Sequence, residues 1–459
     1  MKRFALGKLD EWKGSRFRKP LVLNGARQVG KTWLLKEFGR LRYASAAYIA
    51  FDRNPEAATL FGGGFDFSRI LAGLQALSGV RIVPGDTLVI LDEIQLCPAA
   101  IVALKAWNEE RNEYHLACAG SLAGLSLLPG SGWPVGKTNR MDVFPMSFGE
   151  FLAAIGDEAL WENAVLSGDG FLLNAMLDKL TDRLKLYLLV GGMPAAVEAF
   201  AETKSLDEAR SRQSEILRDY DRDFSKHVPA ALLPRLRAIW DSLPRQLSKI
   251  DKRFVASEVE IKGASSKTRA RDLRDPFEWL EGAGLAYRVW NETKPAIPLS
   301  AYRNHTFKLF GVDTGLLAAQ SALPARAILD GNAVFTHFKG ALAEQFVQQE
   351  LRAAGGDDPA TWMPSNSTAE IDFLIQGEDG IVPVEVKAER NLKAKSLAVY
   401  RAAHSPALAI RTSLAPHLFS EGLLDLPLPA IGAWRRYARR NEGQVFAQNS
   451  LKSPDKVWN

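Results

Sequence analysis

A glycine-rich loop directly after a short apolar run constrains this chain more than any other feature. Its eight residues fit the pattern G-x-x-x-x-G-K-[ST]: Gly25, Ala26, Arg27, Gln28, Val29, Gly30, Lys31 and Thr32. The apolar run Leu21–Leu23 precedes the loop, and a helix-period segment, Thr32–Phe38, follows it. In this setting backbone N–H groups can surround phosphate oxygens at a helix N-terminus, where the helix dipole favours anions. The context predicts a phosphate-binding turn at the start of a parallel α/β sheet.

An acidic pair complements this loop. The apolar run Leu88–Leu91 ends in Asp92 and Glu93, as expected for a buried strand whose carboxyl end meets a ligand. Lys31 is expected to contact the β- and γ-phosphates of ATP, and Thr32 and Asp92 to hold Mg²⁺. Glu93 is expected to act as general base on the attacking water. ATP and Mg²⁺ are therefore the predicted cofactors.

Ser121 follows the next apolar strand, His115–Ala119. Its hydroxyl stands where it can contact the γ-phosphate. The alternative, a serine that caps the following helix, fits the sequence equally well, and both roles stay open.

The order of elements predicts several domains. Strands and helices alternate over the first 145 residues, which is typical of a parallel sheet covered by helices, and helices alone dominate from Phe148 to Phe224. The expected strands of the sheet are Pro20–Asn24, Ala47–Phe51, Thr87–Asp92, Tyr114–Ala119 and Met141–Phe144. The expected divisions are a P-loop core (1–150), a helical lid (151–230), a middle domain (231–305), a C-terminal α/β domain (306–435) and a tail (436–459).

Basic residues are concentrated in the middle domain. The net charge of +5 is too small by itself to indicate nucleic acid, but the stretch from Arg235 to Asp275 carries an equal surplus. A helix is expected over Ser266–Glu281, with Lys267, Arg271 and Arg274 on one face. This helix and a short strand after it resemble a winged helix. DNA is the expected partner, and the alternative is a module that packs against protein.

Several features bear on the compartment. No apolar run approaches the roughly 20 residues that span a bilayer. The charged N-terminus lacks the apolar centre of a secretory signal, and only two cysteines occur. These observations predict a cytoplasmic protein with no membrane partner, disulfide framework or zinc site.

Further stretches along the chain carry a family resemblance. They are Asp92–Gln95, Gly120-Ser121, Phe144–Phe151, Gly191–Pro194, Asp223–His227, Asp313–Leu316 and Pro383–Lys387. Together with the loop they resemble the bacterial and archaeal AAA-like P-loop ATPases whose C-terminal half is called domain of unknown function 4143. The resemblance implies an AAA-type core, a helical lid, a winged-helix-like middle domain and a C-terminal α/β domain. That last domain would be similar to PD-(D/E)XK nucleases, a restriction-endonuclease-like fold.

The chain departs from the family at one position. Where the family usually has Gly-Arg, this sequence has Gly136-Lys137. Lysine keeps the charge but loses the planar fork of arginine. Lys137, or Arg140 three residues later, is expected to serve the γ-phosphate, unless an arginine comes from a neighbouring subunit of an oligomer. Slow hydrolysis is expected.

The nuclease-like interpretation depends on a hairpin. Apolar residues alternate along Glu370–Ile375 and Ile381–Ala388, which leaves Asp372, Glu385 and Lys387 on polar faces. One two-residue turn sets Asp372 opposite Lys387, and a turn one residue earlier sets it opposite Glu385. The two carboxylates are expected to bind Mg²⁺ or Mn²⁺, with Lys387 activating the water. By the resemblance, Glu344 is the preceding acidic ligand. The alternative is a charged, solvated hairpin face.

These observations predict an ATPase that couples its nucleotide state to DNA binding or processing by the nuclease-like domain. The alternative is a regulatory ATPase switch or scaffold, in which that domain is inactive and docks a protein partner.

Overall fold

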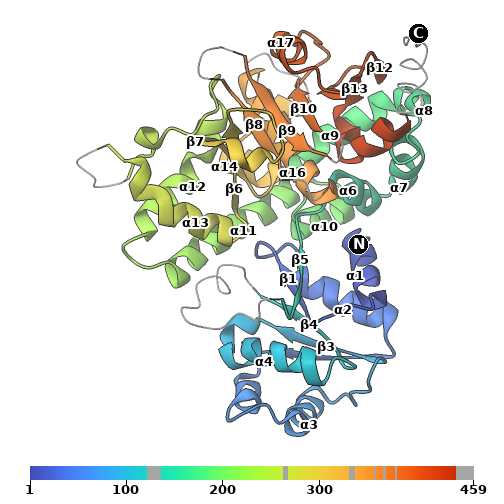
Figure 1. The fold of residues 1–459 in the computed structure, drawn as a ribbon, viewed down its shortest axis with the longest axis vertical. Helices are drawn as coiled ribbons and strands as arrows, with labels where there is room; N and C mark the ends of the chain where they lie inside the picture. The colour runs from blue at the N-terminus through green and yellow to red at the C-terminus, as the bar shows by residue number, and fades with distance from the viewer. Residues whose placement is uncertain are drawn as a thin grey trace, which may run out of the picture. The chain divides into compact units, whose positions relative to one another are not determined.

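The computed structural model describes residues 1–120, 136–261, 267–329, 336–355, 358–364, 369–377 and 380–440. The chain divides into two compact units (Figure 1). The N-terminal unit comprises Lys2–Phe144 together with Glu278–Leu285. The C-terminal unit comprises Pro145–Phe277 and the residues from Ala286 on. Among the described residues, no helix combines the length and the apolar character needed to span a bilayer.

The N-terminal unit contains a parallel five-stranded sheet in the order β2-β3-β4-β1-β5. Its strands are β1 (Leu21–Asn24), β2 (Ser45–Ala50), β3 (Thr87–Asp92), β4 (His115–Ala119) and β5 (Asn139–Asp142). Its helices are α1 (Ala5–Gly14), α2 (Lys31–Arg42), η1 (Pro55–Phe61), α3 (Phe67–Ser78), η2 (Ile94–Leu96) and α4 (Pro98–Glu110). The predicted parallel α/β core is confirmed.

Strand β3 shows why this sheet forms. All six of its residues are buried, as its continuous apolar run predicts. Val89 and Leu91 belong to the hydrophobic core that α3 and α4 complete. Leu88 and Ile90 face the opposite way, toward Gly39 of α2. The strand therefore packs against helices on both faces, and its acidic end is fixed by that packing.

The C-terminal unit starts with the expected run of helices and adds others around a second sheet (Figure 1). The first group is α6 (Phe148–Ile155), α7 (Glu158–Leu160), η3 (Trp161–Val165), α8 (Gly170–Ala175), α9 (Leu177–Val190), α10 (Pro194–Thr203), α11 (Leu206–His227) and α12 (Leu233–Leu247). Next come η4 (Ala256–Glu258), η5 (Ala270–Leu273), α13 (Arg274–Gly282), η6 (Leu299–Tyr302), α14 (Thr314–Gln320), α15 (Ala325–Leu329), α16 (Thr336–Gly355), α17 (Lys395–His404) and η8 (Leu428–Ala433). The last residues of α13 belong to the N-terminal unit.

The second sheet is mixed and has eight strands in the order β12-β13-β11-β10-β9-β8-β6-β7. Its strands are β6 (Ala286–Glu292), β7 (Arg303–Gly311), β8 (Ala360–Trp362), β9 (Ile371–Gln376), β10 (Ile381–Val386), β11 (Ala409–Ser413), β12 (Leu418–Ser420) and β13 (Leu423–Pro427). The hairpin β6–β7 joins the rest through the parallel pairing of β6 with β8. One sheet therefore runs through the expected middle and C-terminal domains, and the expected boundary at 305/306 falls inside β7.

The expected helix over Ser266–Glu281 is shorter in the structure. Residues 262–266 lie outside the described ranges, residues 267–269 are extended, and α13 begins only at Arg274. Pro276 explains the difference, because proline lacks an N–H and is accommodated only in the first turn of a helix. Lys267 and Arg271 therefore do not share a helical face with Arg274.

Buried polar contacts tie the first helices of this unit to the later ones. Glu350 of α16 accepts a hydrogen bond from the backbone N–H of Phe148 at 2.8 Å. Asp313, at the start of α14, accepts one from the N–H of Gly192 at 2.6 Å. Gln349 of α16 donates to the hydroxyl of Tyr187 at 2.9 Å. The stretch expected to be a separate lid is thus part of the same compact body as α14 and α16.

Candidate functional site

The predicted loop lies between β1 and α2, where close backbone packing requires glycine. Gly25 has a φ of +143°, and a Cβ atom there would lie 2.2 Å from the carbonyl oxygen of Val143. Gly30, directly before α2, has a φ of +92°. Gln28 also adopts a left-handed conformation, with a φ of +66°. This backbone is costly for side chains, and such strain is concentrated at ligand-binding turns.

Lys31 points back onto the loop. Its Nζ donates to the carbonyl oxygens of Gly25 and Ala26, both at 2.8 Å. Burial lowers the pKa of Lys31 to about 8, while the nearby Glu93 and Asp92 oppose that shift. The ammonium group is therefore held inside the loop, among the backbone groups expected to surround phosphates.

The hydroxyl of Thr32 donates to Oδ2 of Asp92 at 2.8 Å. The loop after β1 and the end of β3 therefore meet, as the sequence predicts, although β4 lies between the two strands. The same Oδ2 accepts the phenolic proton of Tyr48 at 2.9 Å, and Oδ1 accepts the backbone N–H of Glu93 at 3.0 Å. Thr32 and Asp92 are placed as neighbouring oxygen ligands for a magnesium ion, which fits the preference of Mg²⁺ for such groups.

The contact of Tyr48, which comes from β2, with Asp92 was not predicted from the sequence. Its ring lies under the ammonium of Lys36, 3.6 Å from the ring centroid. Burial, together with Asp92, raises the pKa of the phenol, so it stays a proton donor. No local pattern marks this role, because the partner lies 44 residues away in the sequence.

Glu93 stands in a left-handed conformation, with a φ of +52°. Its Oε2 accepts a hydrogen bond from Nε2 of Gln95 at 2.5 Å. The Oε1 atom of Gln95 is buried and has no hydrogen-bond partner among the described residues. The side chain of Gln95 thus fixes the direction of the Glu93 carboxylate, which is free to serve as a proton acceptor.

A buried arginine holds the backbone of the loop through hydrogen bonds. Arg3 donates to the carbonyl oxygens of Val29 and of Phe144, both at 2.8 Å. It thus ties the loop to the segment that follows β5. These contacts of Arg3 were not predicted from the sequence either, because no pattern in the neighbouring residues indicates that this arginine is buried.

The predicted γ-phosphate cations lie just before edge strand β5 (Lys137) and within it (Arg140). Lys137 precedes β5, whose first residue pairs with the first residue of β1, whereas the loop follows the last residue of β1. Its Nζ pairs with Glu109, near the end of α4, at 2.7 Å. Arg140 is exposed and stands opposite Val22 within the edge strand. Ser121 lies outside the described residues.

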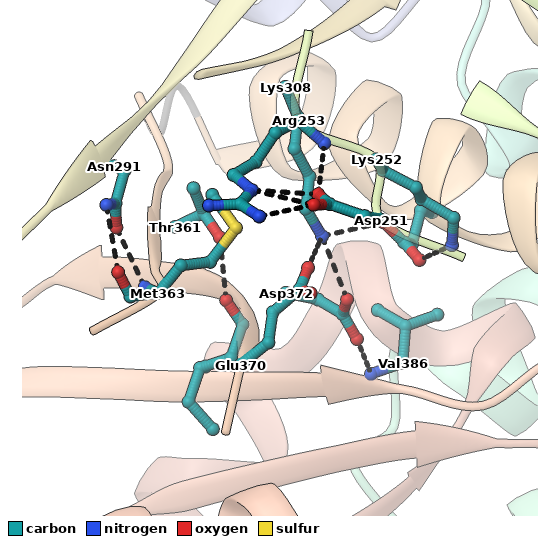
Figure 2. A network of polar contacts seen from close by, with 12 residues as sticks. Asp251, Lys252, Arg253, Asn291, Lys308, Thr361, Met363, Glu370, Asp372 and Val386 are labelled. Carbon is teal, nitrogen blue, oxygen red and sulfur yellow. Dashed lines mark hydrogen bonds and ion pairs between the residues drawn. The ribbon is translucent and has the colours of Figure 1, made fainter. Parts of the chain in front are cut away.

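Two of the four residues predicted for the nuclease-like site, Glu344 of α16 and Asp372 of β9, meet around a buried lysine, Lys308. Figure 2 shows Asp372 beside Lys308. The printed register ends at Val384 opposite Phe373, so the next pair in the same register is Asp372 with Glu385, one of the two expected arrangements. Nζ of Lys308, from β7, lies 3.0 Å from Oε2 of Glu344 and 3.1 Å from Oδ1 of Asp372. It also pairs with Glu370. The alternative interpretation expected the charged face of this hairpin to be solvated. In the structure, Asp372 and Glu385 on that face are buried.

The remaining carboxylate oxygens are mostly engaged. Oδ2 of Asp372 accepts the N–H of Val386 at 2.9 Å, and Oε1 of Glu385 accepts from Lys387 at 2.7 Å. Oε2 of Glu385 has no partner among the described residues, and burial raises the pKa of this carboxyl to about 7. Within the described ranges, no group of three or more His, Cys, Asp or Glu side chains is arranged to hold a metal ion. The side chains of this hairpin therefore do not fit the predicted second metal.

The loop holds a buried lysine, and its threonine is bonded to an aspartate that precedes a glutamate. This arrangement is typical of a P-loop nucleotide-binding site. Comparison with known families agrees. Residues 17–152 match a family described as an AAA domain. Residues 181–327 and 339–431 match two domains of unknown function, DUF8612 and DUF4143. No protein with a curated function matched the chain.

Solved structures with similar folds include an Orc1 protein from Aeropyrum pernix in complex with DNA, at 14% identity over 71% of this chain and 93% of that chain, with a TM-score of 0.27. Cdc6p from Pyrobaculum aerophilum gives 16% identity, the same coverage and a TM-score of 0.25. A RuvB variant from Thermotoga maritima gives 17% identity, coverage of 62% and 87%, and a TM-score of 0.27. At such low scores these structures carry no argument, and the similarity to an AAA domain is that of the family match over residues 17–152.

Proposed function

We propose that the chain binds ATP with Mg²⁺ at residues 25–32 and hydrolyses it. The observation that carries this proposal is the contact between Thr32 and Asp92 at 2.8 Å, beside Lys31 and Glu93. This contact joins the glycine-rich loop to the acidic pair at the end of β3, which lie 60 residues apart in the sequence.

Each side chain then has a defined task. Lys31 leaves its carbonyl partners and holds the β- and γ-phosphates, while the loop backbone surrounds them. Thr32 and Asp92 hold Mg²⁺, which neutralises charge on the phosphate oxygens when bound. Glu93, oriented by Gln95, takes a proton from the attacking water. Because this chain has Lys137 where the family it resembles has arginine, slow intrinsic hydrolysis is expected.

Two substitutions test this site. Lys31→Ala should abolish ATP binding, because it deletes the cation that faces the phosphates. Glu93→Gln should keep binding and lose hydrolysis, because only the proton acceptor is removed. Equilibrium binding of ATP and release of phosphate are measured for each variant. An unchanged ATP affinity in Lys31→Ala would exclude the assignment.

We propose DNA as the partner of the C-terminal unit. Lys267, Arg269, Arg271 and Arg274 are all exposed around η5 and the start of α13. The order α12, α13 and hairpin β6–β7 resembles that of a winged helix, although here the hairpin extends a larger sheet. Exposed cations of this density suit phosphate contacts, whose strength falls with salt.

The test replaces Lys267, Arg271 and Arg274 together by glutamine. Affinity for duplex DNA should fall for all sequences alike, and its salt dependence should flatten. A matched control replaces Arg218, Arg222 and Lys226, which are equally exposed on α11. Equal losses in both triple variants would mean that the effect is only one of net charge.

A second candidate function is favoured by the position of Lys308. In it, the chain is an ATPase switch whose C-terminal domain is not a nuclease but a scaffold that docks a partner protein. Purified protein with Mg²⁺ or Mn²⁺, with and without ATP, should then leave DNA uncut over hours. Divalent-dependent cleavage that is lost in Asp372→Asn would instead support the nuclease.

A further inference from the structure

Lys308 is a fully buried cation between three structural elements. Its side chain has no exposed surface, and its partners come from α16 (Glu344), from β9 (Asp372) and from the residue before β9 (Glu370). Figure 2 shows the ammonium of Lys308 pointing to Asp372, with Glu370 and Lys252 close by. An ammonium has three N–H donors, so the three carboxylates satisfy it completely.

The charges around this ammonium are nearly balanced. Glu344, Glu370 and Asp372 bring three negative charges, and Lys308 and Lys252 bring two positive ones, since Lys252 pairs with the other oxygen of Glu344. Burial by itself would lower the pKa of Lys308, but the three carboxylates raise it well above its ordinary value. The lysine is therefore held as a cation, and without it the excess of negative charge in the cluster would grow from one to two.

The carboxylate oxygens of Glu344 and Asp372 are already engaged while the lysine is present. Both oxygens of Glu344 are paired with lysines, and both oxygens of Asp372 are engaged, one by Lys308 and one by the N–H of Val386. A metal would have to displace an ammonium that makes three charged contacts.

We propose that Lys308 is a built-in substitute for a divalent cation, which holds β7, α16 and β9 together without metal. The same acidic cluster becomes a divalent-cation site once the ammonium is removed and its space is left open. This inference goes beyond the ATPase proposal and does not depend on it.

Two substitutions at position 308 separate the effect of losing the charge from the effect of opening space for an ion. Lys308→Ala removes the ammonium and leaves room for an ion. Lys308→Met removes the same charge but fills the room with an apolar chain of similar length. Breaking a buried ion pair should lower the melting temperature of both variants by on the order of 10 °C in EDTA.

The measurement is thermal unfolding of the full chain, free of nucleotide, as CaCl₂ or MnCl₂ is added. Lys308→Ala should regain more than half of its lost melting temperature, in a saturable way, because carboxylate oxygens suit these ions. Lys308→Met should not, and neither should Lys308→Ala with Asp372→Asn. The methionine variant has the same ATP loop, so it controls for ions bound there.

Three outcomes would overturn the proposal. They are a lack of rescue in Lys308→Ala, equal rescue in Lys308→Met, and a comparable rise in the wild type. Should Lys308→Ala not fold at all, a charge-balanced pair decides. Lys308→Met with Asp372→Asn restores the net charge of the cluster and should melt above Lys308→Met alone. A double variant that melts lower than Lys308→Met would show that Lys308 does not act as the counter-charge.

Discussion

Oδ2 of Asp92 accepts two hydroxyl protons, one from Thr32 and one from Tyr48. This double contact fixes the direction of the carboxylate beside Thr32, where the proposed magnesium ion would be held. Tyr48, which lies outside the recognised motifs, thereby helps to orient the carboxylate of Asp92. Such supporting partners commonly change metal affinity without touching the substrate.

Tyr48→Phe should therefore raise the concentration of free Mg²⁺ needed for half-maximal ATP hydrolysis, by roughly three- to tenfold for the loss of one hydrogen bond. The ring stays under Lys36, so folding should be little affected. Hydrolysis is measured against free Mg²⁺ at saturating ATP. Tyr43→Phe, which removes a bond of Tyr43 to His115, is the matched control. An equal change in both variants would count against a role for Tyr48.

Glu350 provides a prediction on pH. Burial, and after it the nearby Glu150, raises the pKa of Glu350 from 4.5 to about 8, although the Phe148 N–H opposes this. Between these values the folded state keeps a proton that the unfolded state loses, so stability falls as pH rises through this window. Glu350→Gln keeps an acceptor for Phe148 and stays neutral. It should match the wild type near pH 4.5 and exceed it above pH 8 by roughly 1–3 kcal/mol.

Denaturant unfolding at several pH values checks this, with the exposed Glu198→Gln as control. If Glu350→Gln is equally or less stable than the wild type at pH 8.5, the folded state does not raise the pKa of Glu350.

At the scale of elements, the sequence predicted β3 to the residue, because a strand buried on both faces is a continuous apolar run. Edge strand β5 begins two residues earlier than expected, since its Asn139 and Arg140 look like loop residues. Strand β7 was missed altogether. Lys308 interrupts its apolar residues, and lysine is almost never fully buried unless paired. Its partners lie 36 and 64 residues away, so no local signal shows them.

The end of α13 gives a prediction about the loop. Gly284, with a φ of +70°, belongs to the N-terminal unit, and a Cβ there would lie 3.0 Å from the backbone nitrogen of Ala26. Gly284→Ala should lower ATP affinity several-fold by pressing on the loop. Gly79 has nearly the same φ, +68°, but open space around it. Gly79→Ala should show a similar loss of stability, about 1 kcal/mol, with unchanged ATP affinity. Equal ATP affinities in the two variants would show that the loop shifts to accommodate the added methyl group without losing its affinity for ATP.

At the scale of the whole molecule, each unit has its own sheet and its own buried polar contacts. The nucleotide site lies entirely in the N-terminal unit, and the Lys308 cluster lies entirely in the C-terminal unit. Because the two sets of stabilising contacts do not overlap, a ligand of one unit adds binding free energy to that unit alone.

We therefore expect two transitions in calorimetric unfolding of the full chain. ATP with Mg²⁺ at a hundred times its dissociation constant adds about 2.7 kcal/mol to the state that binds it. It should raise one transition by roughly 5–10 °C, given about 2–4 °C per kcal/mol for a unit of this size. Lys31→Ala should remove this shift and leave the second transition in place. Lys308→Met should lower the other transition and leave the response to ATP intact. A single transition that moves with both substitutions would show that the two units unfold as one, and that nucleotide binding stabilises the whole chain.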